Sequence, residues 1–310
     1  MEYREIGKTG MIVSSLSFGA SSLGGVFHEL KEKEGILTVH AAIDSGINFI
    51  DVAPYYGFTK AETLLGKALK EIRRDKYFLS TKVGRFGVSG VKNWDYSAAR
   101  AIKSVEESMQ RLNIDFIDLI NVHDMEFSDL NQIINETLPA LIRLKEQGKV
   151  GHVGITGLPL VNFQYVIDRV PVGTVESILS FCHYCLNDDA LADYLDYFEQ
   201  HGVGVINASP LSMGLLTRRG APDWHPAVEA IISHSRKAVK YCEEKKYPIE
   251  QLAIKYSVSN PKIATTLVST TSPQNIRENI RWVEALQNEQ LLSEVLEILK
   301  PIHRQTWDNS

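Results

Sequence analysis

The sequence contains few cysteines and nothing resembling a leader at its start. Its three cysteines, Cys182, Cys185 and Cys242, are too few for the disulfide framework of a small secreted protein. The first ten residues are polar and charged and lack the apolar core of a signal peptide. Because so few cysteines suit a reducing compartment, the sequence predicts a cytoplasmic protein.

Clustered basic charge and long hydrophobic runs are also absent. The 310 residues include 33 Lys and Arg against 38 Asp and Glu, which gives a formal net charge of -5. Phosphate affinity needs clustered cations, so we expect no nucleic-acid partner. No apolar run reaches the ~18 residues of a transmembrane helix, so we expect no membrane partner. With 44% hydrophobic residues the composition is that of an ordinary globular protein.

One motif resembles a metal or redox site. Cys182 and Cys185 form a C-x-x-C pair. A structural zinc site needs four ligands, and no second pair accompanies this one, so we expect no metal. A reversible thiol pair remains an open alternative.

Eight short apolar runs alternate with helical patterns along the whole chain. They begin near Leu16, Ile47, Tyr77, Phe116, Val150, Thr174, Val203 and Ile263. Most are about one βα unit apart, and they are almost continuously apolar, as parallel strands covered by helices are. Between them, a pattern such as 97–112 repeats residues at the spacing of one helix face. We predict an α/β fold, a single (β/α)8 TIM-barrel domain over 1–310; a doubly wound sheet is the alternative.

Other segments lie outside the eight units. Residues 3–5 and 11–13 flank Gly7 and Gly10 and predict a β-hairpin that caps the bottom of the barrel. The long gap before the eighth strand contains two helical patterns, 227–245 and 248–259. A last pattern, 288–299, predicts an additional C-terminal helix.

Ionisable residues stand at the ends of three consecutive predicted strands. The second strand ends in Asp51, with Tyr56 soon after, the third in Lys82 and the fourth in His123. In barrels of this kind the active site gathers at the C-terminal ends of the strands. A buried Lys or Asp is costly unless it is paired, so we predict an ion pair between Asp51 and Lys82. Each of the four alone is typical of an ordinary rim residue; together they indicate a site.

These residues and their spacing resemble the catalytic tetrad of the aldo-keto reductase superfamily, and the resemblance covers nearly the whole chain. It implies that Tyr56 is the acid or base, that Lys82 and Asp51 tune it, and that His123 orients the substrate oxygen. A cation within ~4–6 Å favours a phenolate, so we expect Lys82 to lower the pKa of Tyr56.

The resemblance also implies a nicotinamide cofactor. No G-x-G-x-x-G follows the first strand, since Gly19, Gly24 and Gly25 do not fit that spacing, which argues against a Rossmann site. The family holds the cofactor with the loops after strands seven and eight. The implied cofactor-binding residues are Gly19, Ala20, Thr156, Ser180, Ser209, Pro210, Leu211, Gly214, Ser269, Thr271, Asn275, Glu278 and Asn279.

Departures from the family pattern favour NAD. NADPH-dependent relatives carry basic residues where this chain has Ser269 and Asn275, and a 2′-phosphate without cations loses its charge-assisted hydrogen bonds. Arg277 lies two positions from Asn275 and on another helix face, but its long side chain could reach a 2′-phosphate, which leaves NADP as the alternative cofactor. Thr156-Gly157 replaces the usual Ser-Asn, and Ala208 replaces an aromatic that stacks on the nicotinamide.

Taken together, these departures resemble one branch of the superfamily, the L-galactose dehydrogenases of plant ascorbate synthesis. The branch implies NAD-dependent oxidation of the C1 hydroxyl of a free aldose to a lactone. Beside Tyr56 and His123, the loop residues expected to line a sugar site are Trp94, Asp124, Glu126 and His183. The alternatives are an NADPH-dependent aldehyde or ketone reductase and a cofactor-sensing subunit resembling potassium-channel β-subunits. Either a monomer or a homodimer is compatible with the sequence.

Overall fold

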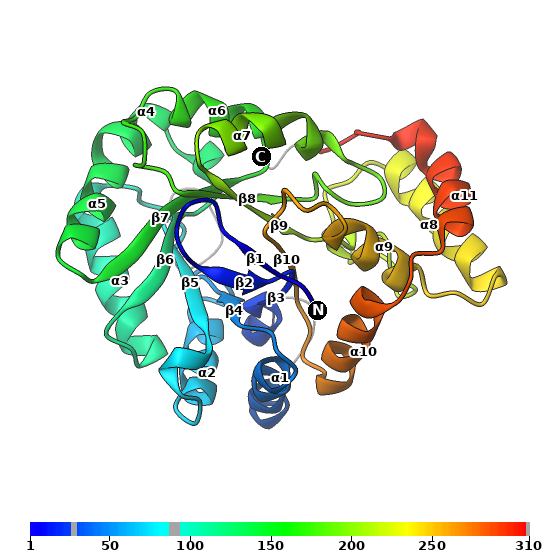
Figure 1. The fold of residues 1–310 in the computed structure, drawn as a ribbon, viewed down its shortest axis with the longest axis horizontal. Coiled ribbons are helices and arrows are strands. Elements are labelled where there is room, and N and C mark those ends of the chain that lie inside the picture. Colours follow the sequence, from blue (N-terminus) through cyan, green and yellow to red (C-terminus); the bar gives the residue numbers. More distant parts are fainter. Residues whose placement is uncertain (26–29, 87–93, 308–310) are drawn as a thin grey trace.

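Eight parallel strands form a closed barrel (Figure 1) in the computed structural model, which describes residues 1–25, 30–86 and 94–307. Chain order is kept around the barrel, and β10 pairs with β3 to close it, with Thr266 opposite Leu16. The strands are β3 (Leu16–Gly19), β4 (Phe49–Asp51), β5 (Phe78–Val83), β6 (Ile117–Val122), β7 (Val150–Gly157), β8 (Ser177–Phe181), β9 (Gly204–Ala208) and β10 (Thr265–Val268). The predicted barrel and its eight strands are therefore confirmed.

Helices surround the barrel, and α8 and α11 pack against each other to one side of it (Figure 1). They are α1 (Glu32–Asp44), α2 (Lys60–Leu69), α3 (Ala98–Leu112), α4 (Leu130–Gln132), α5 (Leu138–Glu146), α6 (Leu160–Ile167), α7 (Leu195–Gln200), α8 (Glu229–Glu244), α9 (Ile249–Val258), α10 (Pro273–Glu284) and α11 (Glu289–Leu299). The additional helices predicted from the sequence correspond to α8, α9 and α11 and are confirmed.

Helix α3 shows how the sequence pattern sets an element. The side chain of Ser97 accepts a hydrogen bond from the backbone N–H of Arg100 at 3.3 Å and so caps the N-terminus. Ala101, Val105 and Leu112 are fully buried on one face, and Asn113 ends the helix in a left-handed conformation at φ 57°.

The hairpin of β1 (Tyr3–Glu5) and β2 (Ile12–Ser14) closes the N-terminal end of the barrel and lies in front of it in Figure 1. Gly7, at φ +55°, lies so close to the start of β9 that a Cβ there would be 2.5 Å from the backbone nitrogen of Gly204. This contact requires glycine, because another side chain would push the hairpin off the barrel. The predicted cap is confirmed, and the C-terminal strand ends form the opposite rim.

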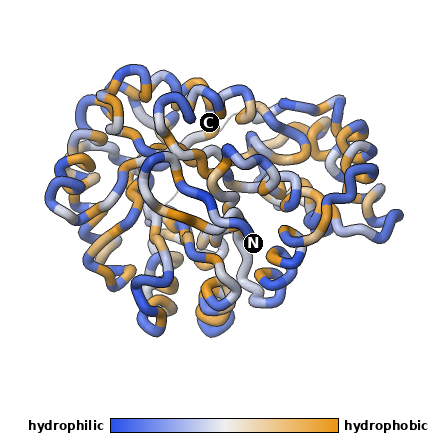
Figure 2. Tube along the Cα trace, in the orientation of Figure 1, coloured by the Kyte–Doolittle hydropathy of each residue, from blue (hydrophilic) through white to orange (hydrophobic). Residues whose placement is uncertain are grey.

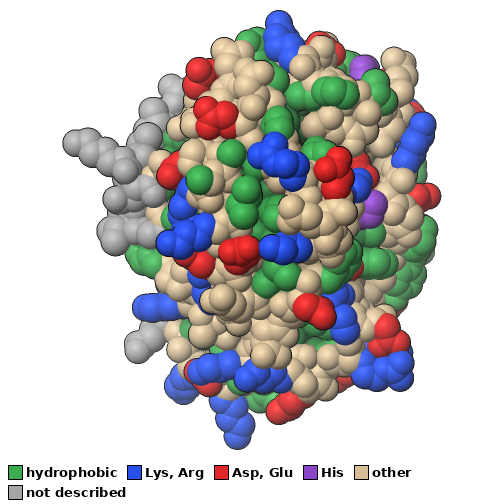
Figure 3. All heavy atoms as spheres, turned by 90° about the vertical axis from the view of Figure 1, so that its left-hand side faces the viewer, with side chains coloured by type: hydrophobic (Ala, Val, Ile, Leu, Met, Phe, Trp, Pro, Cys, Tyr) green, Lys and Arg blue, Asp and Glu red, His purple; other side chains and the backbone are tan. Residues whose placement is uncertain are grey.

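The tube in Figure 2 shows hydrophobic segments running along the strands and alternating along the helices, as expected for strands covered by amphipathic helices. On the face that carries α3 and α5, acidic and basic side chains are interspersed (Figure 3). Within the described ranges, none of the helices combines the length and hydrophobicity needed to cross a bilayer.

Candidate active site

The ends of β4, β5 and β6 bring Asp51, Tyr56, Lys82 and His123 together at the C-terminal rim. The Nζ of Lys82 donates hydrogen bonds to the carboxylate of Asp51 and to the Oη of Tyr56, the latter at 3.2 Å. The ring of His123 stands perpendicular to that of Tyr56, with 5.7 Å between their centroids. The predicted ion pair between Asp51 and Lys82 is thus present, and the phenol of Tyr56 lies between an ammonium and an imidazole.

A chain of buried hydrogen bonds fixes the positions of Lys82 and Asp51. Lys82 also donates to the backbone oxygen of Val52 at 2.9 Å. The second carboxylate oxygen of Asp51 accepts from Ser80 at 2.8 Å, and Ser80 in turn accepts from Asn121 at 2.9 Å. The Lys82 side chain is 1% exposed and that of Asp51 3%. Because buried charges are tolerated only when they are paired and hydrogen-bonded, these contacts fix the ammonium at one position.

Two glycines hold the loop that carries Tyr56. A Cβ on Gly24 would lie 2.6 Å from the carbonyl carbon of Tyr56, and one on Gly57 would lie 2.0 Å from the oxygen of Gly24. The turn after β3 and the loop after β4 therefore touch backbone to backbone, which only glycine permits. In the sequence Gly24 is one of the glycines that do not fit a Rossmann motif; in the fold it positions the loop of Tyr56.

The electrostatics of the site follow from burial. Burial raises the pKa of Tyr56, and the attraction of Lys82 only partly offsets this. Lys82 thus acts to lower the pKa of Tyr56 as expected, but the net shift of that pKa is upward, because desolvation of the phenolate outweighs the neighbouring cation. For Lys82, burial acts to lower the pKa, but the Asp51 carboxylate and Tyr56 outweigh it and raise the pKa. Burial, with help from Arg85 and Lys82, holds the pKa of His123 well below its ordinary range.

Comparisons with known proteins agree with this geometry. The model of the aldo/keto reductase family matches residues 15–300. The chain belongs to the aldo/keto reductase family. It is 47% identical to an L-galactose dehydrogenase of Arabidopsis thaliana over 99% of this chain and 97% of that protein. A D-arabinose 1-dehydrogenase of Saccharomyces cerevisiae is 33% identical over 70% of this chain and 67% of that protein.

A solved structure shows the same architecture. The aldo-keto reductase of Bacillus halodurans in its holo form superimposes with a TM-score of 0.81, at 26% identity, covering 100% of this chain and 99% of that one. The chain is thus an oxidoreductase of a family that uses nicotinamide cofactors. The aldo-keto reductase prediction is confirmed.

The loop after β9 contains several residues with positive φ. Leu211 is near the right-handed helical region and Ser212 follows at φ 47°. The backbone N–H groups of Ser212 and Gly214 donate to the oxygens of Ser209 and Leu211 at 2.8 and 3.0 Å. Ser209 and Gly214 are also left-handed, at φ 59° and 107°. On the neighbouring strand, the hydroxyl of Ser180 is buried without a hydrogen-bond partner in the described part of the chain. The unpartnered hydroxyl of Ser180 fits a polar group of the cofactor.

The loop after β10 is tied to the loop after β3. Ser269 accepts from the backbone N–H of Ser22 at 2.9 Å and donates to its hydroxyl at 2.7 Å. Gly19 lies beside the end of β10, with its ideal Cβ position 3.5 Å from the oxygen of Val268, and Ala20 is buried. Ser269 is therefore an uncharged structural link as well as a candidate cofactor residue.

Helix α10 carries the remaining cofactor candidates. Asn275 is exposed and donates to the hydroxyl of Thr270 at 3.2 Å, and Thr271 lies in the same loop. Glu278 and Asn279 lie in the second turn of α10, which begins at Pro273. Ser272 caps this helix by accepting from the N–H of Asn275.

The predicted substrate residues divide into two groups. Asp124 lies near His123, with its carboxylate 3.7 Å from the Nε2 of His123, and Trp94 contacts Tyr55, their ring centroids 6.0 Å apart. Glu126 instead accepts from the N–H of Leu158 at 3.0 Å and fills the space beside Gly157. His183 pairs with Asp188, its Nδ1 3.0 Å from a carboxylate oxygen.

Thr156 has a different contact from the one expected. Its hydroxyl accepts from the N–H of Asp124 at 2.8 Å and donates to the carboxylate of Asp124 at 3.1 Å. Its single proton is therefore used within the protein. Thr156 holds Asp124, a residue in left-handed conformation at φ 43°.

Sequence reasoning missed Arg85, which follows β5 by two residues. Its guanidinium pairs with Asp124 and lies over the ring of Tyr55 at 3.9 Å. Its side chain is only 12% exposed. The one available signal was its position three residues after Lys82, in the loop that follows β5 at the rim.

The three cysteines are buried. Burial raises the pKa of Cys185 to about 12 and that of Cys182 well above its ordinary range. Both thiols are therefore protonated at neutral pH, which disfavours the reversible thiol pair left open above. No group of three His, Cys, Asp or Glu side chains in the described ranges is arranged to hold a metal ion.

Proposed function

We propose that the protein oxidises the C1 hydroxyl of a free aldose to a lactone with NAD, and that L-galactose is its aldose. The observation that carries this proposal is the hydrogen bond from Lys82 to the phenol of Tyr56, at the barrel rim and beside His123. Similarity to two sugar dehydrogenases, one of them 47% identical over nearly the whole chain, supports an aldose as substrate, and the other is named as a 1-dehydrogenase. L-galactose is the sugar named in the more similar of the two.

In this proposal Tyr56 accepts the proton of the C1 hydroxyl as the C1–H bond breaks. A bound nicotinamide supplies the acceptor for the hydride. Lys82 stabilises the phenolate of Tyr56 through its 3.2 Å hydrogen bond, and Asp51 keeps Lys82 in place and charged. His123 is a neutral imidazole because its pKa is lowered, so it orients the substrate oxygen by a hydrogen bond without adding charge.

We expect the rate of aldose oxidation to rise with pH. Because burial raises the pKa of Tyr56, only a small fraction of it is ionised at neutral pH, and this fraction grows about tenfold per pH unit below the pKa. Lys82 stays charged and His123 neutral across the same range. A pH profile of kcat/KM should therefore climb with a slope near one from roughly pH 7 to 9. A profile that falls above neutral pH would contradict this assignment.

We propose that the loops after β9 and β10 hold the dinucleotide, with Ser209, Pro210, Leu211 and Gly214 at the pyrophosphate. The uncharged Ser269 and Asn275 favour NAD, because the hydroxyl of Ser269 is engaged by Ser22 and offers no cation to a 2′-phosphate. We expect kcat/KM with NAD to exceed that with NADP by about tenfold or more, the effect of one charge-assisted hydrogen bond.

A variant that adds a positive charge tests the proposed basis of the preference for NAD over NADP. Asn275→Arg should shift the preference toward NADP, whereas Arg277→Gln, on another face of α10, should leave the ratio unchanged. Equal kcat/KM values for the two cofactors in the unmodified protein would support the aldehyde reductase alternative instead.

The direct test of the proposed function is a panel of substrates. Initial rates of nicotinamide reduction are measured with L-galactose, D-arabinose, other aldoses and simple primary alcohols, each with NAD and NADP. We expect L-galactose with NAD to give the highest kcat/KM. The absence of a rate with every free aldose would overturn the proposal. If it holds, the lactone product places the protein in ascorbate synthesis; a cytoplasmic location and a monomeric or homodimeric state remain predictions.

A further inference from the structure

Arg85 lies in a cage of three aromatic rings at the barrel rim. The carbon centre of its guanidinium lies 3.9 Å from the ring centroid of Tyr55, 4.3 Å from that of Trp94 and 4.9 Å from that of Phe127. These rings come from three loops: after β4, before α3 and after β6. An arginine held in this way has little conformational freedom left to lose on binding a ligand.

The partner of Arg85 is equally fixed. Asp124 pairs with the guanidinium and is held from behind by two hydrogen bonds with Thr156. Its left-handed backbone, at φ 43°, is strained for a residue other than glycine, and such strain concentrates at functional sites. The Nε2 of His123 lies 3.7 Å from the same carboxylate oxygen that Arg85 contacts. A donor and an acceptor thus stand side by side next to the tetrad.

This neighbourhood contains unused hydrogen-bonding capacity. The Nε of Arg85, the Nε1 of Trp94 and the Nδ1 of His123 are buried and have no hydrogen-bond partner among the residues described. An unsatisfied buried polar atom is costly, and a cluster of them indicates a ligand that brings oxygen atoms.

The geometry points to Arg85 and Asp124 as a clamp that selects substrates with hydroxyls on neighbouring carbons. A guanidinium only donates hydrogen bonds and a carboxylate only accepts them. A vicinal diol complements the pair, because one hydroxyl accepts from Arg85 while the next donates to Asp124. Simple alcohols and aldehydes lack the second hydroxyl and gain nothing from the pair. The inference rests on the proposed aldose oxidation and assigns the choice of sugar over plain alcohol to two residues.

The aromatic rings serve the same recognition. Tyr55 faces Trp94 edge to face at 6.0 Å and His123 at 6.0 Å, so the cage continues to the tetrad. Aromatic surface packs against the C–H faces of a sugar ring while Arg85 and Asp124 address its hydroxyls. Binding and orientation of the polyol then present its reacting carbon to Tyr56.

The test is a double-mutant cycle in which a protein side chain and a single hydroxyl of the sugar are changed separately and together. Dissociation constants are measured by calorimetry for unreactive 1,5-anhydro sugars, the parent compound and a series lacking one hydroxyl each, with the unmodified protein, Arg85→Lys and Asp124→Asn. In the unmodified protein, removal of at least one hydroxyl should weaken binding by about 10–100-fold, the effect of a hydrogen bond to a charged group. In the two variants, removal of the same hydroxyl should weaken binding only about twofold. Arg85→Lys keeps the positive charge but loses the planar guanidinium, so it distinguishes the effect of the hydrogen-bonding geometry from that of the charge.

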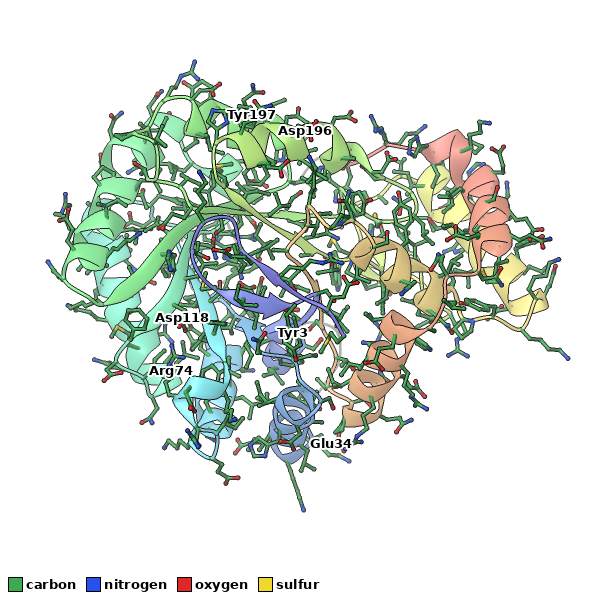
Figure 4. All side chains as sticks on the ribbon, viewed as in Figure 1. Tyr3, Glu34, Arg74, Asp118, Asp196 and Tyr197 are labelled. Carbon is green, nitrogen blue, oxygen red and sulfur yellow. The ribbon has the colours of Figure 1, made fainter. Side chains whose placement is uncertain are left out.

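Arg74 offers a matched control at the other end of the barrel. Like Arg85, it pairs with an aspartate, Asp118, and lies over an aromatic ring, with its guanidinium carbon 4.9 Å from the ring centroid of Tyr77. Arg74 and Asp118 are labelled in Figure 4. Arg74→Gln should leave every hydroxyl penalty as in the unmodified protein. Thermal unfolding of each variant confirms that folded protein is compared.

The outcomes separate the clamp from the proposed function. Equal penalties in the unmodified protein and both variants, for every hydroxyl, overturn the clamp even if aldoses are oxidised. Binding of no polyol at all also overturns it. Polyol binding with the expected penalties but no turnover of any aldose supports the clamp and contradicts only the proposed oxidation.

Discussion

Replacing Tyr56 by phenylalanine should lower kcat for aldose oxidation about a thousandfold. The substitution removes the one group that lies between Lys82 and His123 and can take a proton, and a positioned acid or base contributes about 10²- to 10⁴-fold. KM should change little, because sugar recognition lies with other residues. The phenolate that Lys82 stabilises no longer exists in Tyr56→Phe, so the rise of kcat/KM with pH should disappear as well.

Tyr3 provides the control for this substitution. It lies on the hairpin at the closed end of the barrel (Figure 4) and donates to the oxygen of Gly46 at 2.8 Å. Tyr3→Phe removes the same hydroxyl and should leave kcat unchanged. Steady-state rates of both variants decide the matter: Tyr56→Phe with more than about a tenth of the original kcat would exclude Tyr56 as the proton acceptor.

Replacing Lys82 by methionine should destabilise the protein and inactivate it together. The substitution leaves the carboxylate of Asp51 buried without its cation, which costs about 3–5 kcal/mol of unfolding free energy. It also removes the group that stabilises the phenolate, so we expect kcat to fall by about a hundredfold or more. Denaturant unfolding and steady-state rates measure the two effects on the same preparation.

A double substitution and a second ion pair separate these effects. Adding Asp51→Asn to Lys82→Met removes the unpaired charge and should recover part of the stability but none of the activity. Arg111 pairs at 2.6 Å with Glu62, which is fully buried between α2, α3 and β5 and accepts a hydrogen bond from Thr81 rather than from the tetrad. Arg111→Met should cost comparable stability and leave kcat of the folded protein unchanged. A double variant that regained activity would contradict the role given to Lys82.

The sequence predicted the fold and the tetrad because both depend on local patterns. Apolar runs separated by amphipathic stretches specify the strands, and a parallel barrel brings successive strand ends to one rim. Asp51, Lys82 and His123 could therefore be placed together from their positions in the chain alone. The hairpin could also be predicted from the sequence, because Gly7 and Gly10 lie between two short strand patterns.

The remaining features depend on tertiary contacts. The direction in which the pKa of Tyr56 shifts is set by burial, which the position of the residue along the chain does not reveal. Arg85 has the sequence environment of a surface cation, and its aromatic neighbours come from three separate loops. Thr156 stands where the family pattern suggests a cofactor contact, yet its hydroxyl is occupied by Asp124, a residue 32 positions away.

The identity of the oxidised carbon tests the central claim most directly. L-galactose is incubated with the protein and NAD, and the product is identified by carbon NMR before it hydrolyses. We expect a lactone, in which C1 has passed from the anomeric to the ester carbonyl oxidation state, and one reduced nicotinamide formed for each molecule of lactone. Oxidation at any other carbon, or reduced nicotinamide formed without a lactone, would contradict the assignment of Tyr56 and its neighbours to the C1 hydroxyl.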